Sequence, residues 1–145
     1  MRAGIFIAVV SIITLIAAQG QGQAAMLMGL QPLAHTYSIV AYDADTNQMG
    51  VAVQSHYFGV GPVVPWAEPG VGVVATQSQV EVSYGPLGLE FMRAGKTAQQ
   101  ALTGLLAADL TPEVRQVAMI DVNGGVAAHT GAKCIPEASN AKGMY

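Results

Sequence analysis

Thr36 is the residue of this chain whose type and position point most directly to chemistry. It precedes an apolar run, Tyr37-Ser38-Ile39-Val40-Ala41-Tyr42, and follows a segment with the pattern of a removable leader. If the peptide bond before Thr36 is cut, the residue carries a free α-amine beside its hydroxyl. A threonine activated by its own amine is a known nucleophile in covalent catalysis. Without the cut, Thr36 is an ordinary β-branched residue at the start of a strand, and that alternative stays open.

Ser55 and His56 are the next candidates, because they stand at the end of the second apolar segment, Met49 to Ser55. The connection between the two segments, residues 43–48, is dense in turn formers and predicts a hairpin. In a hairpin the end of the second strand can approach the first, which gives His56 a higher functional prior than the other histidines. The competing interpretation for His56 is a structural bond to the backbone.

The motifs predict neither a metal site nor a cofactor. His35, His56 and His129 lack the spacing of metal ligands. Residues 43–47 begin like a calcium loop, but Gln48 stands where the glycine of the sharp turn belongs, so we interpret them as a hairpin turn. The chain has 145 residues, enough for one domain, a net charge of −3 and no basic run. This balance argues against nucleic-acid binding.

The first residues are typical of a secretory signal peptide. A short positive start is followed by an apolar run, Ile5 to Ala18, and then by small and polar residues. The run is shorter than the roughly 20 residues that span a bilayer, so we expect only transient membrane contact through the leader and a secreted or periplasmic protein. Cuts after Gly20 or Ala24 fit best, and neither exposes Thr36. We therefore predict a signal peptide in 1–25, a propeptide-like linker in 26–35 and a domain in 36–145, with a second processing step before Thr36.

The elements that must position these residues alternate at short intervals. Strands are expected in 37–42, 49–55 and 71–77, the first two apolar on both faces as if covered on both sides. Three prolines predict an ordered loop in 60–70. Two helices follow, the second opened by a capping box of Thr97 and Gln100, and then a hairpin around Asn123-Gly124. This order predicts an α+β fold of antiparallel sheet with helices packed on one face.

Several blocks of the sequence then carry a resemblance to a known family. The chain resembles the family catalogued as domain of unknown function 1028, which is grouped with the N-terminal-nucleophile (Ntn) hydrolases. The similarity runs in the same order from Thr36 to about Cys134. Its blocks are Thr36-Tyr37-Ser38-Ile39-Val40-Ala41, Gly50-Val51-Ala52-Val53-Gln54-Ser55, Val63-Val64-Pro65-Trp66-Ala67, Gly70-Val71-Gly72-Val73-Val74-Ala75-Thr76-Gln77, Tyr84-Gly85-Pro86-Leu87-Gly88-Leu89, Arg115-Gln116 and His129-Thr130-Gly131.

The resemblance implies an αββα sandwich of antiparallel sheets with Thr36 as nucleophile at the head of the first strand. It implies polar support from Ser55 and His56, the latter standing where the family often has a lysine. The expected substrate is an amide of a small molecule or peptide, and self-association into a homo-oligomer is left open. The family pattern would start another strand at Lys142 to Tyr145, so we expect a fold incomplete at the C-terminus, the N-terminal part of a longer domain. The alternative is a non-catalytic envelope or ligand-binding module on the same fold, with the Trp66 loop and the strand ends forming a ligand cleft.

Overall fold

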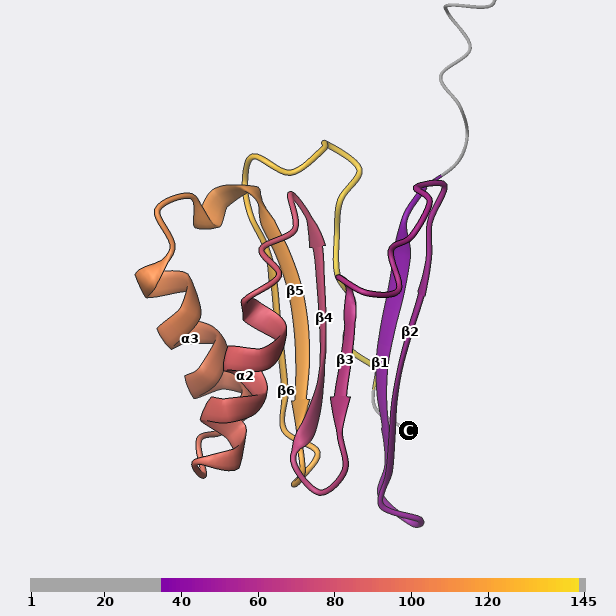
Figure 1. Ribbon diagram of the computed structural model, residues 1–145, viewed down its shortest axis with the longest axis vertical. Coiled ribbons are helices and arrows are strands. Elements are labelled where there is room, and N and C mark those ends of the chain that lie inside the picture. Colours follow the sequence, from indigo (N-terminus) through magenta and orange to yellow (C-terminus); the bar gives the residue numbers. More distant parts are fainter. Residues whose placement is uncertain (1–34, 144–145) are drawn as a thin grey trace, which may run out of the picture. The chain divides into compact units, whose positions relative to one another are not determined.

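The computed structural model describes residues 35–143, which form six strands, two α-helices and one short 3-10 helix (Figure 1). The predicted signal peptide and all of the linker except His35 lie outside these residues. Among the described residues, no helix has both the length and the apolar character needed to cross a bilayer. In chain order the elements are β1 (Tyr37–Asp43), β2 (Gln48–Gln54), β3 (Pro65–Glu68), β4 (Gly72–Ser78), α2 (Tyr84–Arg93), α3 (Ala98–Ala108), η1 (Pro112–Val114), β5 (Arg115–Asp121) and β6 (Val126–Thr130).

β1 and β2 form an antiparallel hairpin, as the turn formers between them predict. The register pairs Tyr37 with Gln54 at the open end and Asp43 with Gln48 at the turn. Asp43 closes the turn, because its Oδ1 accepts the backbone N–H groups of Asp45 and Thr46 at 2.9 and 3.3 Å. Short polar side chains that bond to the following backbone are what stabilises such a connection.

The larger sheet contains four antiparallel strands in the order β3-β4-β5-β6. Both helices lie on one face of it, and the β1–β2 hairpin packs on the other, so the described residues make three layers (Figure 1). β4 lies in the middle, and its residues from Gly72 to Gln77 are all buried. An α+β fold with antiparallel sheets and helices on one face is therefore confirmed.

β3 corrects the prediction of an ordered loop in 60–70. The three prolines argue against a regular central strand, but β3 is an edge strand of four residues, paired with β4 alone among the described strands. Pro65 is its first residue, where a missing N–H removes no bond that a central strand would need. The proline rule excludes a central strand, and β3 is not central.

The capping box predicted at the start of the second helix is confirmed. Thr97 caps α3, with its side chain accepting the N–H of Gln100 while the Gln100 side chain accepts the N–H of Thr97. Gly95, just after α2, adopts φ +83°, the left-handed conformation that glycine tolerates best at a helix end. The core between helices and sheet consists of Val74, Tyr84, Leu89, Met92, Ala98, Ala101, Leu102, Leu105, Val117, Met119 and Ala127.

The β1–β2 hairpin has one covered and one open face among the described residues. Its side chains alternate between half-buried and exposed along both strands, and Ile39 on the open face is 49% exposed. This differs from the expectation that both faces are covered. Residues 35–143 supply one helical layer, so the second helical layer of an αββα sandwich is not among them.

Candidate functional site

Thr36 and Ser55 lie side by side at the open end of the β1–β2 hairpin. Thr36 directly precedes β1 and Ser55 directly follows β2, one step beyond the Tyr37–Gln54 pair. Their hydroxyl oxygens are 2.8 Å apart, a hydrogen-bond distance. Both side chains are half-buried. They continue the alternating pattern that places every second residue on the covered face of the hairpin. The hairpin geometry thus joins two of the three residues that the sequence singles out.

A backbone group holds Ser55 in this position. The N–H of Tyr57 donates to Ser55 Oγ at 3.0 Å. A hydroxyl has one proton to donate and two lone pairs to accept with, so Ser55 still has one proton and one lone pair for a second partner. Thr36 Oγ1 lies at hydrogen-bond distance, and either hydroxyl can be the donor between them. The three groups form a short chain from the Tyr57 backbone through Ser55 to Thr36.

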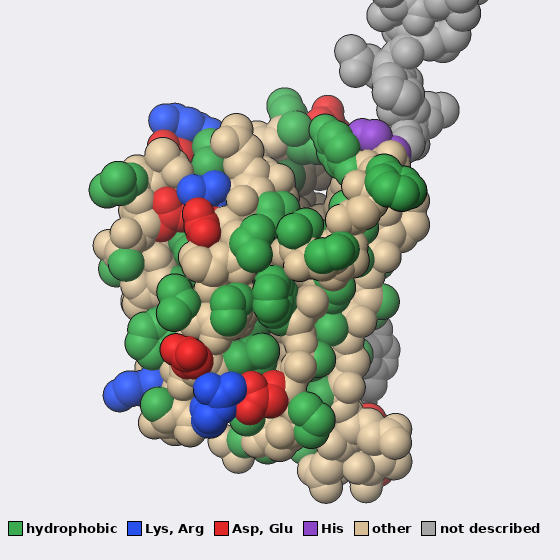
Figure 2. Space-filling model, in the orientation of Figure 1, with side chains coloured by type: hydrophobic (Ala, Val, Ile, Leu, Met, Phe, Trp, Pro, Cys, Tyr) green, Lys and Arg blue, Asp and Glu red, His purple; other side chains and the backbone are tan. Residues whose placement is uncertain are grey.

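His56 points to a different neighbour. Its ring lies against the Tyr57 ring, with centroids 4.2 Å apart and planes inclined by 37°. Within residues 35–143, no hydrogen bond joins the His56 ring to Thr36 or Ser55. Its closeness to the candidate nucleophile therefore comes through the loop after β2, not through a direct side-chain contact. Figure 2 shows histidine atoms beside hydrophobic side chains at the open end of the β1–β2 hairpin, where both His35 and His56 lie.

Two aromatic residues beside the site were missed in the sequence. Tyr57 is 68% exposed and Phe58 is fully exposed, both in the loop that follows Ser55. The available signal was a pair of adjacent aromatics outside any predicted strand, directly after the candidate polar residues. The sequence pattern of strands and helices carries no information on such a loop.

A charged cluster links the helices to the sheet. No local pattern predicts it, because its members come from separate elements. Asp109, at the end of α3, binds Arg115 Nε at 2.7 Å and accepts the hydroxyl of Tyr84 at 2.9 Å. The Arg115 guanidinium is the main reason that the pKa of Asp109 lies well below its usual range. Burial, and then the bond to Asp109, raise the pKa of Tyr84 above its usual value. The cluster ties α2, α3 and β5 together.

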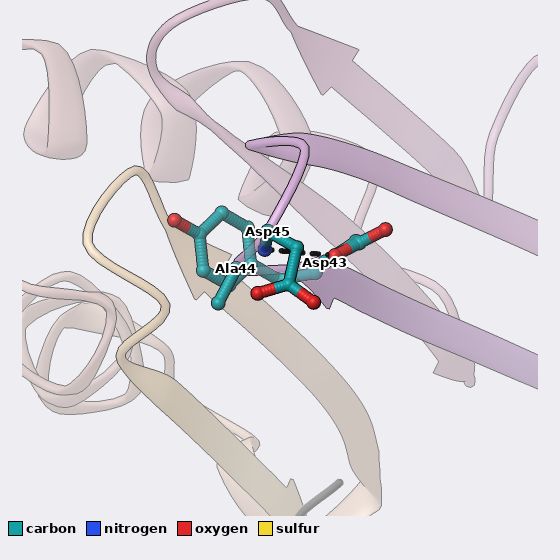
Figure 3. A pocket seen from close by; sticks show the side chains of 4 residues that line it. Asp43, Ala44 and Asp45 are labelled. Carbon is teal, nitrogen blue, oxygen red and sulfur yellow. Dashed lines mark hydrogen bonds between the residues drawn. The ribbon is translucent and has the colours of Figure 1, made fainter.

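A hollow of about 300 Å³ lies at the β1–β2 turn, lined by Tyr42, Asp43, Ala44 and Asp45 (Figure 3). It sits at the opposite end of the hairpin from Thr36, roughly 20 Å away along β1 at the rise of an extended strand. The hollow is therefore separate from the Thr36 site. Among the described residues, no group of three or more His, Cys, Asp or Glu side chains is arranged to hold a metal ion.

Comparison with known proteins gives the family. The model of a family of unknown function, DUF1028, matches residues 36–145. The crystal structure of protein SPO2555 from Silicibacter pomeroyi, also assigned to DUF1028, superposes with a TM-score of 0.67 at 28% identity over 70% of this chain. The chain spans about half of that relative, 48% of its length. No curated protein sequence gives a significant match. On the family match and the shared fold, the chain belongs to DUF1028.

Proposed function

We propose that this protein is an exported hydrolase of the Ntn type that cleaves an amide bond in a small molecule or peptide. Thr36 is the nucleophile, and it becomes competent once the peptide bond after His35 has been cut. The observation that carries the proposal is the 2.8 Å contact between the hydroxyls of Thr36 and Ser55 at the head of β1. The base in this chemistry is the freed α-amine of Thr36, and the contact with Ser55 holds the attacking oxygen in one orientation.

In the proposed reaction the freed α-amine of Thr36 accepts the hydroxyl proton while Oγ1 attacks the carbonyl carbon. The carbon–nitrogen bond then breaks, and the amine returns the proton to the departing nitrogen. The acyl group stays on Oγ1 as an ester. Water, deprotonated by the same amine, attacks the ester, releases the acid and restores the hydroxyl. An α-amine has a pKa of about 7.7 to 8.0, close to the pH at which a general base must work.

Ser55 steadies the oxygen of Thr36 during the attack. Because Ser55 Oγ accepts the N–H of Tyr57, its own proton is free to point at Thr36 Oγ1 as that oxygen loses its hydrogen. His56 acts one step further away as a positioning residue. Its ring packs on Tyr57, the residue whose backbone fixes Ser55. A role for His56 through Tyr57 replaces the direct polar support that the family resemblance suggests.

The alternative of a non-catalytic binding module has less support. It needs the Trp66 loop and the strand ends to form a cleft, but the indole packs against Gly85 and the core, and its Nε1–H donates to the carbonyl of Val63 at 3.2 Å. A tryptophan placed in this way completes the core. The hydrolase proposal relies instead on hydroxyls that are only half-buried and lie at a strand end.

The mature N-terminus tests the proposal. Intact mass and N-terminal sequencing of the exported full-length protein should find Thr36 first, and amide hydrolysis should be lost in Thr36→Ala and retained in Thr36→Ser. Thr36→Ser keeps a hydroxyl and an amine in the same place, so it is the matched control. Persistence of His35 on all of the exported material would overturn the proposal, as would undiminished hydrolysis by Thr36→Ala.

A further inference from the structure

The loop after β2 presents a bare aromatic surface beside the Thr36 site. Phe58 is fully exposed and Tyr57 is 68% exposed, two neighbours in sequence that give most of their surface to water. Gly59, the next residue, takes φ +78°, so the chain turns sharply just after them. Single exposed apolar residues are ordinary on protein surfaces, but adjacent aromatics beside a candidate nucleophile are a typical feature of a binding site.

The loop is tied to the nucleophile by hydrogen bonds. The backbone N–H of Tyr57 bonds to Ser55 Oγ at 3.0 Å, and Ser55 Oγ bonds to Thr36 Oγ1 at 2.8 Å. The loop backbone is therefore a near neighbour of the attacking oxygen, and a group attached to the carbonyl can reach the loop. The His56 ring lies against the Tyr57 ring with centroids 4.2 Å apart and limits the freedom of the Tyr57 side chain.

The charges of the segment decide which group fits. From Thr46 to Ala67 the chain contains no Asp, Glu, Lys or Arg. Apart from His56, the segment therefore offers a charged substituent no ionic side chain, and contact with the aromatic rings would strip water from such a substituent. An aromatic or large apolar substituent has no charge to desolvate, so the same contact favours it.

We propose that Tyr57 and Phe58 bind an uncharged aromatic or large apolar group next to the scissile carbonyl, and so determine which amides the protein accepts. This inference rests on the proposed hydrolysis at Thr36 for the position of the carbonyl. It goes further by assigning the substrate class, amides of aromatic and large apolar acids, and the residues that select it.

Binding to an inactive variant tests the inference without relying on turnover. Full-length ¹⁵N-labelled protein carrying Thr36→Ala is titrated with N-acetylphenylalanine amide and, in parallel, with N-acetylaspartic acid α-amide. The phenylalanine amide should bind at least about 10-fold more tightly and should shift the backbone signals of Tyr57, Phe58 and Gly59, since burying an aromatic side chain is worth about that factor or more.

Variants then assign the contact. Phe58→Ala and Tyr57→Ala should each weaken binding of the phenylalanine amide by about 10-fold and leave the aspartic acid amide unaffected. Leu110→Ala is the matched control, because Leu110 is 96% exposed but follows α3, in a different part of the fold. It should bind both probes as the parent does.

The outcomes separate this inference from the proposed hydrolysis. Equal binding of the two probes, tighter binding of the aspartic acid amide, or unchanged binding by Phe58→Ala would each overturn the aromatic contact. So would a concentration-dependent dimer abolished by Phe58→Ala, because the aromatic surface would then belong to self-association. If the phenylalanine amide binds at the loop but the processed Thr36 protein never hydrolyses it, the contact stands and the hydrolysis fails. If the protein hydrolyses both amides with equal kcat/KM, the proposed hydrolysis stands and the aromatic contact fails.

Discussion

The indole ring of Trp66 lies directly against the backbone of Gly85. A Cβ built on Gly85 would overlap three carbons of the ring, so only glycine permits this approach. Trp66 belongs to the edge strand β3 and Gly85 to the first turn of α2, and their contact joins the edge of the larger sheet to the helical layer. The sole tryptophan of the chain therefore has a packing role, and it depends on the lack of a side chain at Gly85.

Gly85→Ala should destabilise the protein by about 1 to 3 kcal/mol, because the new methyl group forces the ring or the helix to move. Urea unfolding followed by far-UV circular dichroism measures the change. The matched control is Gly104→Ala in α3, where a Cβ would meet nothing within 4 Å. That variant should stabilise the protein by about 0.5 to 1 kcal/mol through helix propensity. Equal effects at the two sites would contradict the packing argument.

Asp109 should make the free energy of unfolding depend on pH in the acid range. Arg115 holds the pKa of Asp109 below its unfolded value, which is about 3.9. The stabilisation is therefore complete above about pH 4 and is lost as the pH falls from there through the lowered folded pKa. Asp109→Asn should cost about 3 kcal/mol at pH 7 by leaving Arg115 without its charged partner, and should flatten the loss below pH 4.

Urea midpoints measured between pH 2 and 7 give the acid profile of each variant. Asp45→Asn serves as the control, because Asp45 is exposed in the β1–β2 turn. It should reproduce the parent profile. An Asp109→Asn variant as sensitive to acid as the parent would show that other carboxylates cause the loss.

Tyr84 should produce the opposite dependence at alkaline pH. Burial and the bond to Asp109 raise its pKa above the unfolded value of about 10. Its stabilisation is then complete below about pH 10 and is lost as the pH rises from there through the raised folded pKa. Tyr84→Phe should cost about 1 kcal/mol at pH 7, from the lost 2.9 Å bond to Asp109, and should remove this alkaline loss. Thermal unfolding between pH 8 and 11 measures it.

Tyr37→Phe is the control for the alkaline experiment, because Tyr37 is 68% exposed at the start of β1. Its alkaline profile should match that of the parent. The assignment to Tyr84 would fail if both variants lost stability above pH 10 to the same extent.

Ser55→Ala should lower kcat of the proposed hydrolysis by about 10- to 100-fold with little change in KM. The reason is that a nucleophile without its orienting partner reacts from many unproductive positions. Ser55→Thr keeps a hydroxyl at this position and should retain most of the activity. Steady-state kinetics on a phenylalanine amide measures both, with circular dichroism to establish that each variant is folded. A Ser55→Ala variant with unchanged kcat would remove Ser55 from the mechanism.

Local patterns in the sequence were enough for most of the fold. The turn formers in 43–48 and the capping box of Thr97 and Gln100 both act within a few residues, so their effects could be predicted. β3 was missed because a proline rule for central strands was applied to an edge strand. Whether a strand is central depends on pairing across the sheet, which no local pattern encodes.

The candidate site also combines contacts that follow from local patterns with contacts that do not. The nearness of Thr36 and Ser55 follows from the hairpin, so it could be expected from the two strands and their turn. The pairing of Asp109 with Arg115 could not be expected from the sequence, because it depends on how the helices pack on the sheet. The ring contact of His56 depends on the path of an irregular loop, for which the residue types gave no rule.

The hairpin turn has a consequence for how this protein can vary. Asp43 pairs with Gln48 across the turn, and the same ladder brings the Thr36 and Ser55 hydroxyls together at its far end. Exposed turns generally tolerate insertions and deletions. Here one added or deleted residue that shifted the ladder by one step would turn one hydroxyl to the opposite face of the hairpin. The exposed turn is thus as intolerant of length change as an active-site loop, although its own side chains are about 20 Å from the hydroxyls.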